Sequence, residues 1–112
     1  MPDHAMSGEC DALATRIRRM LPAGFREVKM FGGLSFMVDE RLVVAAGKQG
    51  DLLVHVDPAR SEALLNRPGA RGAEMGKGRS MGPAWIEVAH ASLDDAALTY
   101  WIGEALTFNR PG

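Results

Sequence analysis

Three hydrophobic runs that follow one another with very little connecting chain constrain the fold more than any other feature. They occupy residues 34–38, 42–46 and 52–56. In the first run the apolar side chains of Leu34, Phe36 and Val38 occur at every second position, which is the period of a β-strand. The connecting segments are too short for the crossover that parallel strands require. The runs therefore predict an antiparallel meander of three strands.

Two short segments beside this meander predict local backbone geometry. The pair Gly32-Gly33 precedes the first strand and indicates a bend, a bulge or a close approach of two backbones. The pair Asp39-Glu40 connects the first two runs. Because glutamate is uncomfortable at positive φ, we expect a longer turn or one built on a type I turn.

The segments on either side predict helices at both ends of the chain. Ser7 is a suitable N-cap for a first helix, which residues 22–24 end with a glycine in the left-handed region. A final helix is expected to open at Ser92, with an acidic residue in its first turn. The apolar stripes of these helices comprise Cys10, Leu13, Ile17, Met20 and Leu21 in the first, and Leu98, Trp101, Ile102, Ala105 and Leu106 in the last.

Between the meander and the final helix the pattern predicts one short helix and two more strands. Asp57-Pro58 supplies an N-cap followed by proline at the first helical position, and the helix should stop before Pro68. Strands are expected near residues 73–75 and at 84–88. The predicted order is α-β-β-β-α-β-β-α, an α+β fold with helices on one face of an antiparallel sheet.

Length and composition limit the classes of protein. The chain has 112 residues, of which 46% are hydrophobic and 24% charged, as is ordinary for a single globular domain. Its net charge of −1 gives no overall field for nucleic acid or an anionic membrane. We expect residues 1–7 to form a disordered tail and residues 8–112 a single domain. With one cysteine, no signal peptide and no apolar run of bilayer length, a cytoplasmic location is predicted.

Four short sequences carry a resemblance to a known family. They are MFGG at 30–33, RPGAR at 67–71, GRSM at 78–81 and WIEV at 85–88. In this order they resemble the N-terminal domain of the TfoX/Sxy family, over roughly residues 25–108. The turn departs from the family pattern, which often has Asp-Gly where this chain has Asp39-Glu40.

The resemblance implies a two-layer α/β sandwich similar to the secretion-chaperone-like fold. Members of the family are linked to regulation of natural competence, acting with the cyclic-AMP receptor protein at promoters. That link belongs to longer proteins with a second, C-terminal domain, so we expect this chain to be a stand-alone domain. Folds of this shape often pair through exposed faces, and a homodimer is one expectation.

The sequence gives little support for a catalytic or metal-binding function. His4, His55 and His90 are far apart and lack ligand spacing. Cys10, Ser35 and Ser80 are surrounded by no nucleophile motif. The GKGRS sequence at 76–80 lacks the spacing and the following helix of a phosphate-binding loop. We therefore expect no catalytic residue, metal or cofactor.

Two groups of basic residues suggest a surface for a partner. One surrounds the first helix, at Arg16, Arg18, Arg19 and Arg26, and the other lies in the glycine-rich segment 67–83. Acidic residues are interspersed with both groups, so a solvated surface is favoured over direct nucleic-acid binding. The predicted interaction surface comprises Lys29, Gly32, Gly33, Arg67, Arg71, Lys77, Arg79 and Trp85.

The favoured hypothesis is a non-enzymatic regulatory domain that binds a protein partner, by family analogy a component of the transcription machinery. Replacing Arg71 and Arg79 by glutamate is expected to weaken partner capture without lowering the melting temperature. A rival hypothesis is a small-molecule-binding or enzymatic protein with a pocket between the sheet and the helices, near Lys29, His55 and Trp85. A second rival is a direct nucleic-acid binder. The sequence does not identify the partner, a ligand or the oligomeric state.

Overall fold

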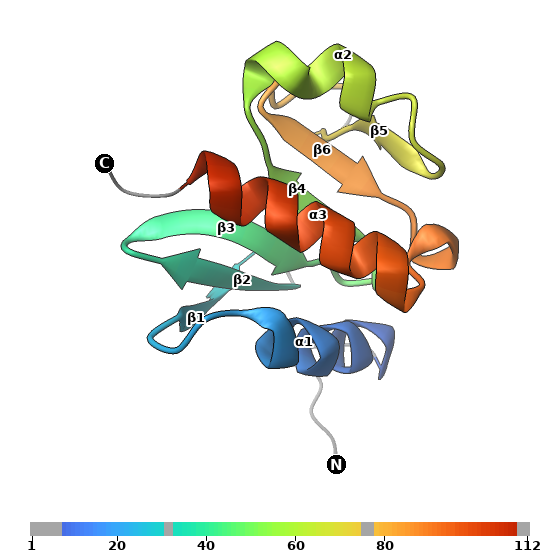
Figure 1. Cartoon of the computed structure of the whole chain (residues 1–112). Helices are drawn as coiled ribbons and strands as arrows, with labels where there is room; N and C mark the ends of the chain where they lie inside the picture. The colour runs from blue at the N-terminus through green and yellow to red at the C-terminus, as the bar shows by residue number, and fades with distance from the viewer. Residues whose placement is uncertain (1–7, 31–32, 75–77, 110–112) are drawn as a thin grey trace.

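The computed structural model describes residues 8–30, 33–74 and 78–109. Its strands form one antiparallel sheet in the order β1-β2-β3-β4-β6-β5 (Figure 1). The strands are β1 (Arg26–Met30), β2 (Gly33–Val38), β3 (Arg41–Ala46), β4 (Leu52–His55), β5 (Ala70–Gly72) and β6 (Trp85–Val88). The helices are α1 (Gly8–Met20), α2 (Ser61–Leu64) and α3 (Asp95–Phe108), with 3₁₀ turns η1 (Pro58–Arg60) and η2 (His90–Ser92).

The predicted α+β class is confirmed, with one strand more than the sequence indicated. The additional strand is β1, whose sequence REVKM has three charged residues and lies at the edge of the sheet. An edge strand that is solvated does not need alternating apolar side chains, so it carries little periodic signal. The short strand expected at residues 73–75 lies instead at Ala70–Gly72.

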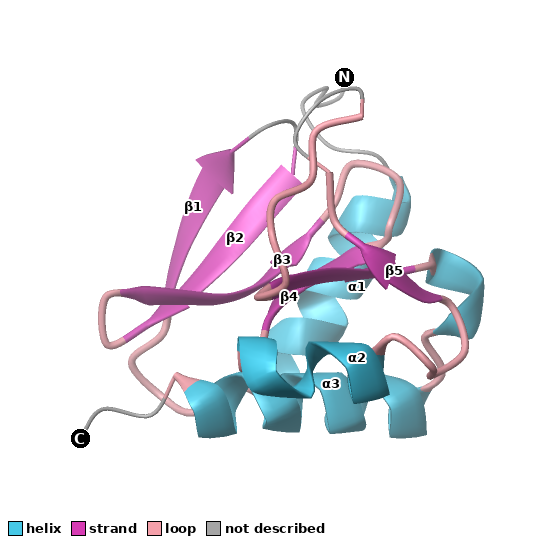
Figure 2. Cartoon of the chain, turned by 90° about the horizontal axis from the view of Figure 1, so that it is seen from above, coloured by secondary structure: helices cyan, strands magenta, loops and turns pink. Residues whose placement is uncertain are grey.

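Two helices cover one face of the sheet, and among the described residues no helix covers the other, here called the helix-free face. Figure 2 shows α1 and α3 on the same side of the strands. Helix α3 packs on β3 and β4, α1 packs on β2 and β3, and the two helices contact each other. The largest buried side chains of this layer include Trp101, Phe36 and Ile17. The apolar core therefore lies between the helix pair and the sheet.

Helix α1 follows the predicted pattern closely. Its buried residues are Cys10, Leu13, Ala14 and Ile17, which share one face of the helix. The Cys10 thiol is fully buried and donates a hydrogen bond to the Ala46 carbonyl oxygen at 3.5 Å. Burial, with a smaller effect of the nearby Asp11 carboxylate, raises the pKa of this thiol. The thiol is thus a packing residue and is inert as a nucleophile.

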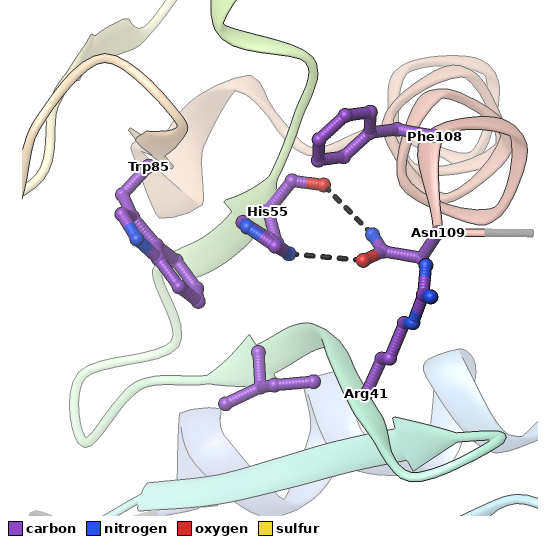
Figure 3. A pocket seen from close by; sticks show the side chains of 6 residues that line it. Arg41, His55, Trp85, Phe108 and Asn109 are labelled. Carbon is purple, nitrogen blue, oxygen red and sulfur yellow. Dashed lines mark hydrogen bonds between the residues drawn. The ribbon is translucent and has the colours of Figure 1, made fainter.

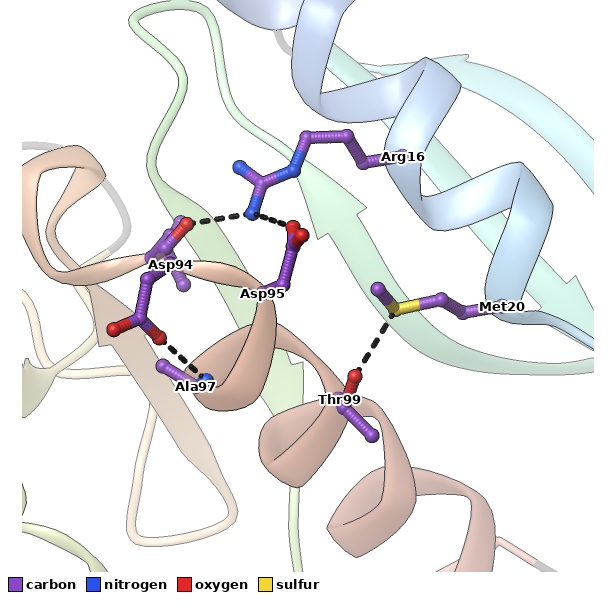
Figure 4. Close-up of polar contacts among 7 residues, drawn as sticks. Arg16, Met20, Asp94, Asp95, Ala97 and Thr99 are labelled. Atoms are coloured by element: carbon purple, nitrogen blue, oxygen red, sulfur yellow. Dashed lines mark hydrogen bonds and ion pairs between the residues drawn. The ribbon is translucent and has the colours of Figure 1, made fainter.

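Helix α3 begins three residues later than the sequence suggested. Asp94 is the N-cap, and its carboxylate accepts a hydrogen bond from the backbone N–H of Ala97 at 2.8 Å, whereas Ser92 lies in η2. Arg16 of α1 donates to the Leu93 carbonyl at 2.7 Å and to the Asp95 carboxylate at 3.1 Å (Figure 4). These hydrogen bonds hold the start of α3 against the middle of α1.

The turn between β2 and β3 corrects the expectation of a longer or type I turn. Val38 pairs with Arg41, so the loop contains only Asp39 and Glu40. Both residues have positive φ, 53° and 66° respectively. A two-residue hairpin loop of this kind matches the twist of the strands, and strand pairing therefore outweighs the local strain of a left-handed glutamate.

Gly33 fulfils the prediction of a close backbone approach. A Cβ atom built at this position would overlap the backbone carbonyl oxygen of Ala46 on the neighbouring strand β3. Only glycine leaves room for the two strands to pair here.

In the described ranges, no helix is long and apolar enough to cross a lipid bilayer.

Candidate functional site

The helix-free face of the sheet is the candidate site. Paired residues on this face form a row across all six strands, namely Val28, Ser35, Ala45, Leu53, Glu87 and Arg71. The middle of the row is apolar, and the β5 end is charged. Small side chains at Ser35 and Ala45 make the centre of the face low, so taller neighbours enclose a hollow around it.

One hollow on this face, here called the upper hollow, has a volume of about 350 Å³. Its floor includes Ser35, Ala45 and Leu53. Its walls come from the segment between β5 and β6, through Ala73 and Met81, and from Trp85 of β6. Its charged lining residues are Lys48, Asp51, Glu74 and Glu87. The upper hollow thus has an apolar floor and a mostly acidic rim.

A second hollow, the lower hollow, lies at the other end of the same strands and also has a volume of about 350 Å³. Its lining residues are Arg41, Leu42, His55, Trp85, Phe108 and Asn109 (Figure 3). Leu42 and Trp85 line both hollows. The two hollows therefore adjoin each other at these two residues, here called the Leu42–Trp85 ridge, and the pair of hollows is called the groove.

The imidazole of His55 is held in a defined orientation within the lower hollow. It stacks on the Trp85 indole, with ring centroids 4.2 Å apart and planes 19° apart, and meets the Phe108 ring edge-on at 5.3 Å. The Asn109 amide nitrogen donates to the backbone carbonyls of Ala105 at 2.8 Å and His55 at 3.2 Å. The amide oxygen must therefore be the atom 3.0 Å from His55 Nδ1.

This arrangement assigns the tautomer of neutral His55. An amide oxygen is an acceptor only, so Nδ1 carries the proton and Nε2 keeps its lone pair. Within the described ranges no hydrogen bond is formed by Nε2. The lower hollow thus offers one hydrogen-bond acceptor at His55, one cation at Arg41 and apolar walls on either side.

Arg71 connects two carboxylates at the acidic rim. Its guanidinium lies 3.2 Å from Asp51 Oδ2 and 3.0 Å from Glu87 Oε1. The other oxygen of Asp51 accepts a hydrogen bond from the backbone N–H of His90 at 2.8 Å. Arg71 therefore stabilises the junction of β4, β5 and β6, a structural role that the sequence did not indicate.

The structure brings together only part of the predicted interaction surface. Trp85 and the buried Gly33 line the upper hollow, and Arg71 lies on the same face of the sheet. Lys29 lies on the edge strand β1, and Arg67 covers the ring of Tyr100 with its guanidinium carbon 3.6 Å from the centroid. Arg79 is exposed and lines neither hollow. Gly32 and Lys77 lie outside the described residues.

Three of the four basic residues around α1, Arg16, Arg18 and Arg26, are engaged within the molecule, whereas Arg19 is exposed and forms no ion pair among the described residues. Arg18 binds both oxygens of Glu27, at 2.6 and 2.9 Å, and this pair lowers the pKa of the Glu27 carboxyl. Arg26 pairs with Glu40 at 2.9 Å, and Arg16 pairs with Asp95. A phosphate backbone would have to compete with these carboxylates, which weakens the case for direct nucleic-acid binding.

Sequence reasoning missed several residues of the groove. The sequence pattern places Leu42 and Leu53 in strands without marking a functional face, and it gives no indication of a role for Arg41, Phe108 or Asn109. The period-2 pattern does place Leu53 and His55 on the face opposite Val54, which was the available signal.

Comparison with known proteins gives one match. A family model described as the TfoX N-terminal domain matches residues 23–109, which includes every strand together with α2 and α3. Helix α1 precedes the matched residues. Neither the curated proteins nor the solved structures gave a significant match.

Proposed function

Because the chain belongs to the TfoX N-terminal domain family, a family of regulatory-type domains not known as enzymes, we propose that it is a protein-interaction domain. Its contact surface is the helix-free face of the sheet, centred on Leu53 and the Trp85–Leu42 ridge. Its role is regulatory, and by family analogy the partner belongs to the transcription or competence machinery. The protein itself carries out no reaction.

One observation carries this proposal. An antiparallel sheet normally buries one face and leaves the other solvated and polar. Here the second face instead has apolar side chains at its centre, a partly buried tryptophan, and a groove bounded by charged residues. Tryptophan at an apolar centre with a polar and charged rim is typical of protein-binding surfaces.

A second candidate function rests on the lower hollow alone. Its volume of about 350 Å³ is within the range of small-molecule sites. Arg41 and His55 supply two polar groups beside the rings of Trp85 and Phe108. A small planar anion suits this combination. Lys29, which was expected to belong to such a pocket, does not line it.

Affinity capture from lysate of the protein's own cells, with and without nuclease, tests the proposed function. Three tagged proteins are compared: the wild type, Leu53→Arg on the groove floor, and Leu65→Arg as a matched control. Leu65 is 39% exposed and lies just after α2, away from both hollows. All three should have the same circular dichroism spectrum.

We expect a stoichiometric partner that survives nuclease with the wild type and with Leu65→Arg, and is lost with Leu53→Arg. Equal capture by all three proteins would contradict the use of this face. Loss of the partner on nuclease treatment would instead favour a nucleic-acid bridge. With no partner at all, a metabolite screen on wild type and Arg41→Ala would test the second candidate function.

A further inference from the structure

We propose that the groove binds one amphipathic helix of a partner protein, with an acidic residue at the Arg41 end and a basic residue at the Glu74 end. This inference rests on the proposed function, because it names the occupant of the same face. It is carried by the continuity of the two hollows, by their shape and by the different charges at their ends.

The dimensions of the groove suit a helix of about four turns. The lining residues of β3 and its following turn run from Arg41 to Lys48. Because β3 ends at Ala46 and Lys48 lies in the turn, these seven residue steps span at most roughly 23 Å. A helix covers that distance in about fifteen residues. A single short helix can therefore contact both hollows at once.

The cross-section of the groove favours a helix with one apolar stripe. Ser35 and Ala45 form a low floor, and each is less than a tenth exposed although no helix covers it. Leu53 continues this floor, Met81 lines the wall, and the Leu42–Trp85 ridge lies between the two hollows. One apolar side chain of the partner helix would fill the hollow on one side of the ridge. A second apolar side chain, one or two helical turns further along, would fill the hollow on the other side. Anchors at i, i+3 or i+4 and i+7 have this spacing.

The ends of the groove carry different charges. Arg41 is exposed at the lower end and, within the described ranges, forms no ion pair. At the upper end Asp51, Glu74 and Glu87 outnumber Lys48 as lining residues, and one arginine is shared between Asp51 and Glu87. Glu74 is exposed and has no ion pair among the described residues. An occupant with opposite charges at its two ends complements this arrangement.

The test uses three synthetic fifteen-residue helical peptides with the same apolar stripe. The first has glutamates at one end and lysines at the other, the second has glutamates at both ends, and the third has lysines at both ends. Binding to the wild type, Arg41→Glu, Glu74→Lys and Leu53→Arg is measured by fluorescence anisotropy at low and moderate salt. Folding of each variant is verified by circular dichroism.

We expect the mixed peptide to bind the wild type about tenfold more tightly than either uniform peptide, from two partly exposed charge pairs. Arg41→Glu should shift the preference to the lysine peptide, and Glu74→Lys to the glutamate peptide. Leu53→Arg should bind none of the three. Higher salt should reduce the preference for the mixed peptide.

The alternative outcomes separate this inference from the proposed function. Equal binding of the three peptides, abolished by Leu53→Arg, would overturn the charge pattern and leave the face as an interaction surface. No peptide binding, with lysate capture still dependent on Leu53, would overturn the helical occupant only. A dimer in sedimentation that dissociates on Leu53→Arg would assign the groove to a second copy of this chain, against the inference.

Discussion

Asn109 holds His55 through both of its polar side-chain atoms. Its amide nitrogen donates to the His55 backbone carbonyl at 3.2 Å, and its amide oxygen lies 3.0 Å from Nδ1 of the imidazole. Asn109 is only 4% exposed, and it also caps the end of α3. One residue therefore links the last turn of α3 to the end of β4.

Replacing Asn109 by leucine should lower the free energy of unfolding by about 1–3 kcal/mol, because buried polar groups lose their partners. Urea denaturation measures this change. Asn66→Leu is the matched control, since Asn66 is exposed and its amide donates only to the Glu62 carbonyl at 3.3 Å. The control should change stability by less than about 0.5 kcal/mol.

The same contact makes a prediction about the state of the imidazole. Nitrogen NMR of the wild type at alkaline pH should show a protonated Nδ1 and an unprotonated Nε2 for His55. In Asn109→Leu this tautomer should no longer be favoured by a hydrogen bond. A wild-type spectrum with the proton on Nε2 would contradict the assigned orientation of the Asn109 amide.

The strained turn predicts a stabilising substitution. Glu40 has φ of 66°, a conformation in which glycine has no Cβ penalty. Glu40→Gly should therefore raise the free energy of unfolding by about 0.5 kcal/mol, even though the exposed pair with Arg26 is lost. Glu40→Gln keeps the strain and loses the charge, so it should be slightly less stable than the wild type. A Glu40→Gly variant that is less stable than Glu40→Gln would contradict this prediction.

The position of Arg71 predicts a cost for reversing its charge. A glutamate there would lie beside Asp51 and Glu87, whose side chains are only 21% and 33% exposed. Arg71→Glu should lower the free energy of unfolding by about 1–2 kcal/mol. Arg79→Glu, at an exposed position, should change it by less than about 0.5 kcal/mol. Thermal unfolding of the two variants checks this difference, and equal melting temperatures would contradict it.

This prediction changes how the basic segment is tested. Loss of partner capture by Arg71→Glu would combine a surface effect with a folding effect. Arg79→Glu is the cleaner substitution, because Arg79 has no ion pair in the described part of the chain and lines neither hollow.

The Arg18–Glu27 pair predicts a pH dependence of stability. Hydrogen bonds from Arg18 lower the pKa of Glu27 in the folded protein, so the stabilisation is present at neutral pH and is lost as pH falls through that pKa. Both side chains are partly solvated, which limits the effect to about 0.5–1 kcal/mol. Glu27→Gln should lose this amount at neutral pH, and the difference from the wild type should shrink as pH falls through the lowered pKa of Glu27.

Urea denaturation of the wild type, Glu27→Gln and Glu62→Gln across this pH range measures the effect. Glu62 is exposed and forms no ion pair in the described ranges, so Glu62→Gln should track the wild type at every pH. A difference between wild type and Glu27→Gln that stays constant with pH would show that the carboxylate charge is not responsible.

Much of the fold could be predicted because its elements have local signals. The apolar stripe of Leu98, Trp101 and Ile102 identifies α3, and the alternation from Leu34 to Val38 identifies β2. Strand β1 lacked such a signal, since charged residues dominate it. Its pairing with β2, which aligns Arg26 with Met37, comes from a register that only the assembled sheet sets.

The candidate site was harder to predict because it joins distant parts of the chain. His55 and Trp85 are thirty positions apart in the sequence yet stack directly, and Asn109 approaches from the end of the last helix. Their meeting depends on β6 pairing beside β4 rather than on any local pattern. The glycine-rich segment drew attention through its composition, but its contribution to the groove comes from the apolar side chains of Ala73 and Met81.

The edge strand β1 has a consequence for how copies of this domain behave when crowded. Open sheet edges are where proteins most readily add strands and grow into fibres. Arg26, Glu27 and Lys29 surround the free edge of β1 with charge, and β5 at the opposite edge is only three residues long. Neither edge is a good template for polymerisation. A domain protected in this way can keep an apolar face available at high concentration without forming aggregates.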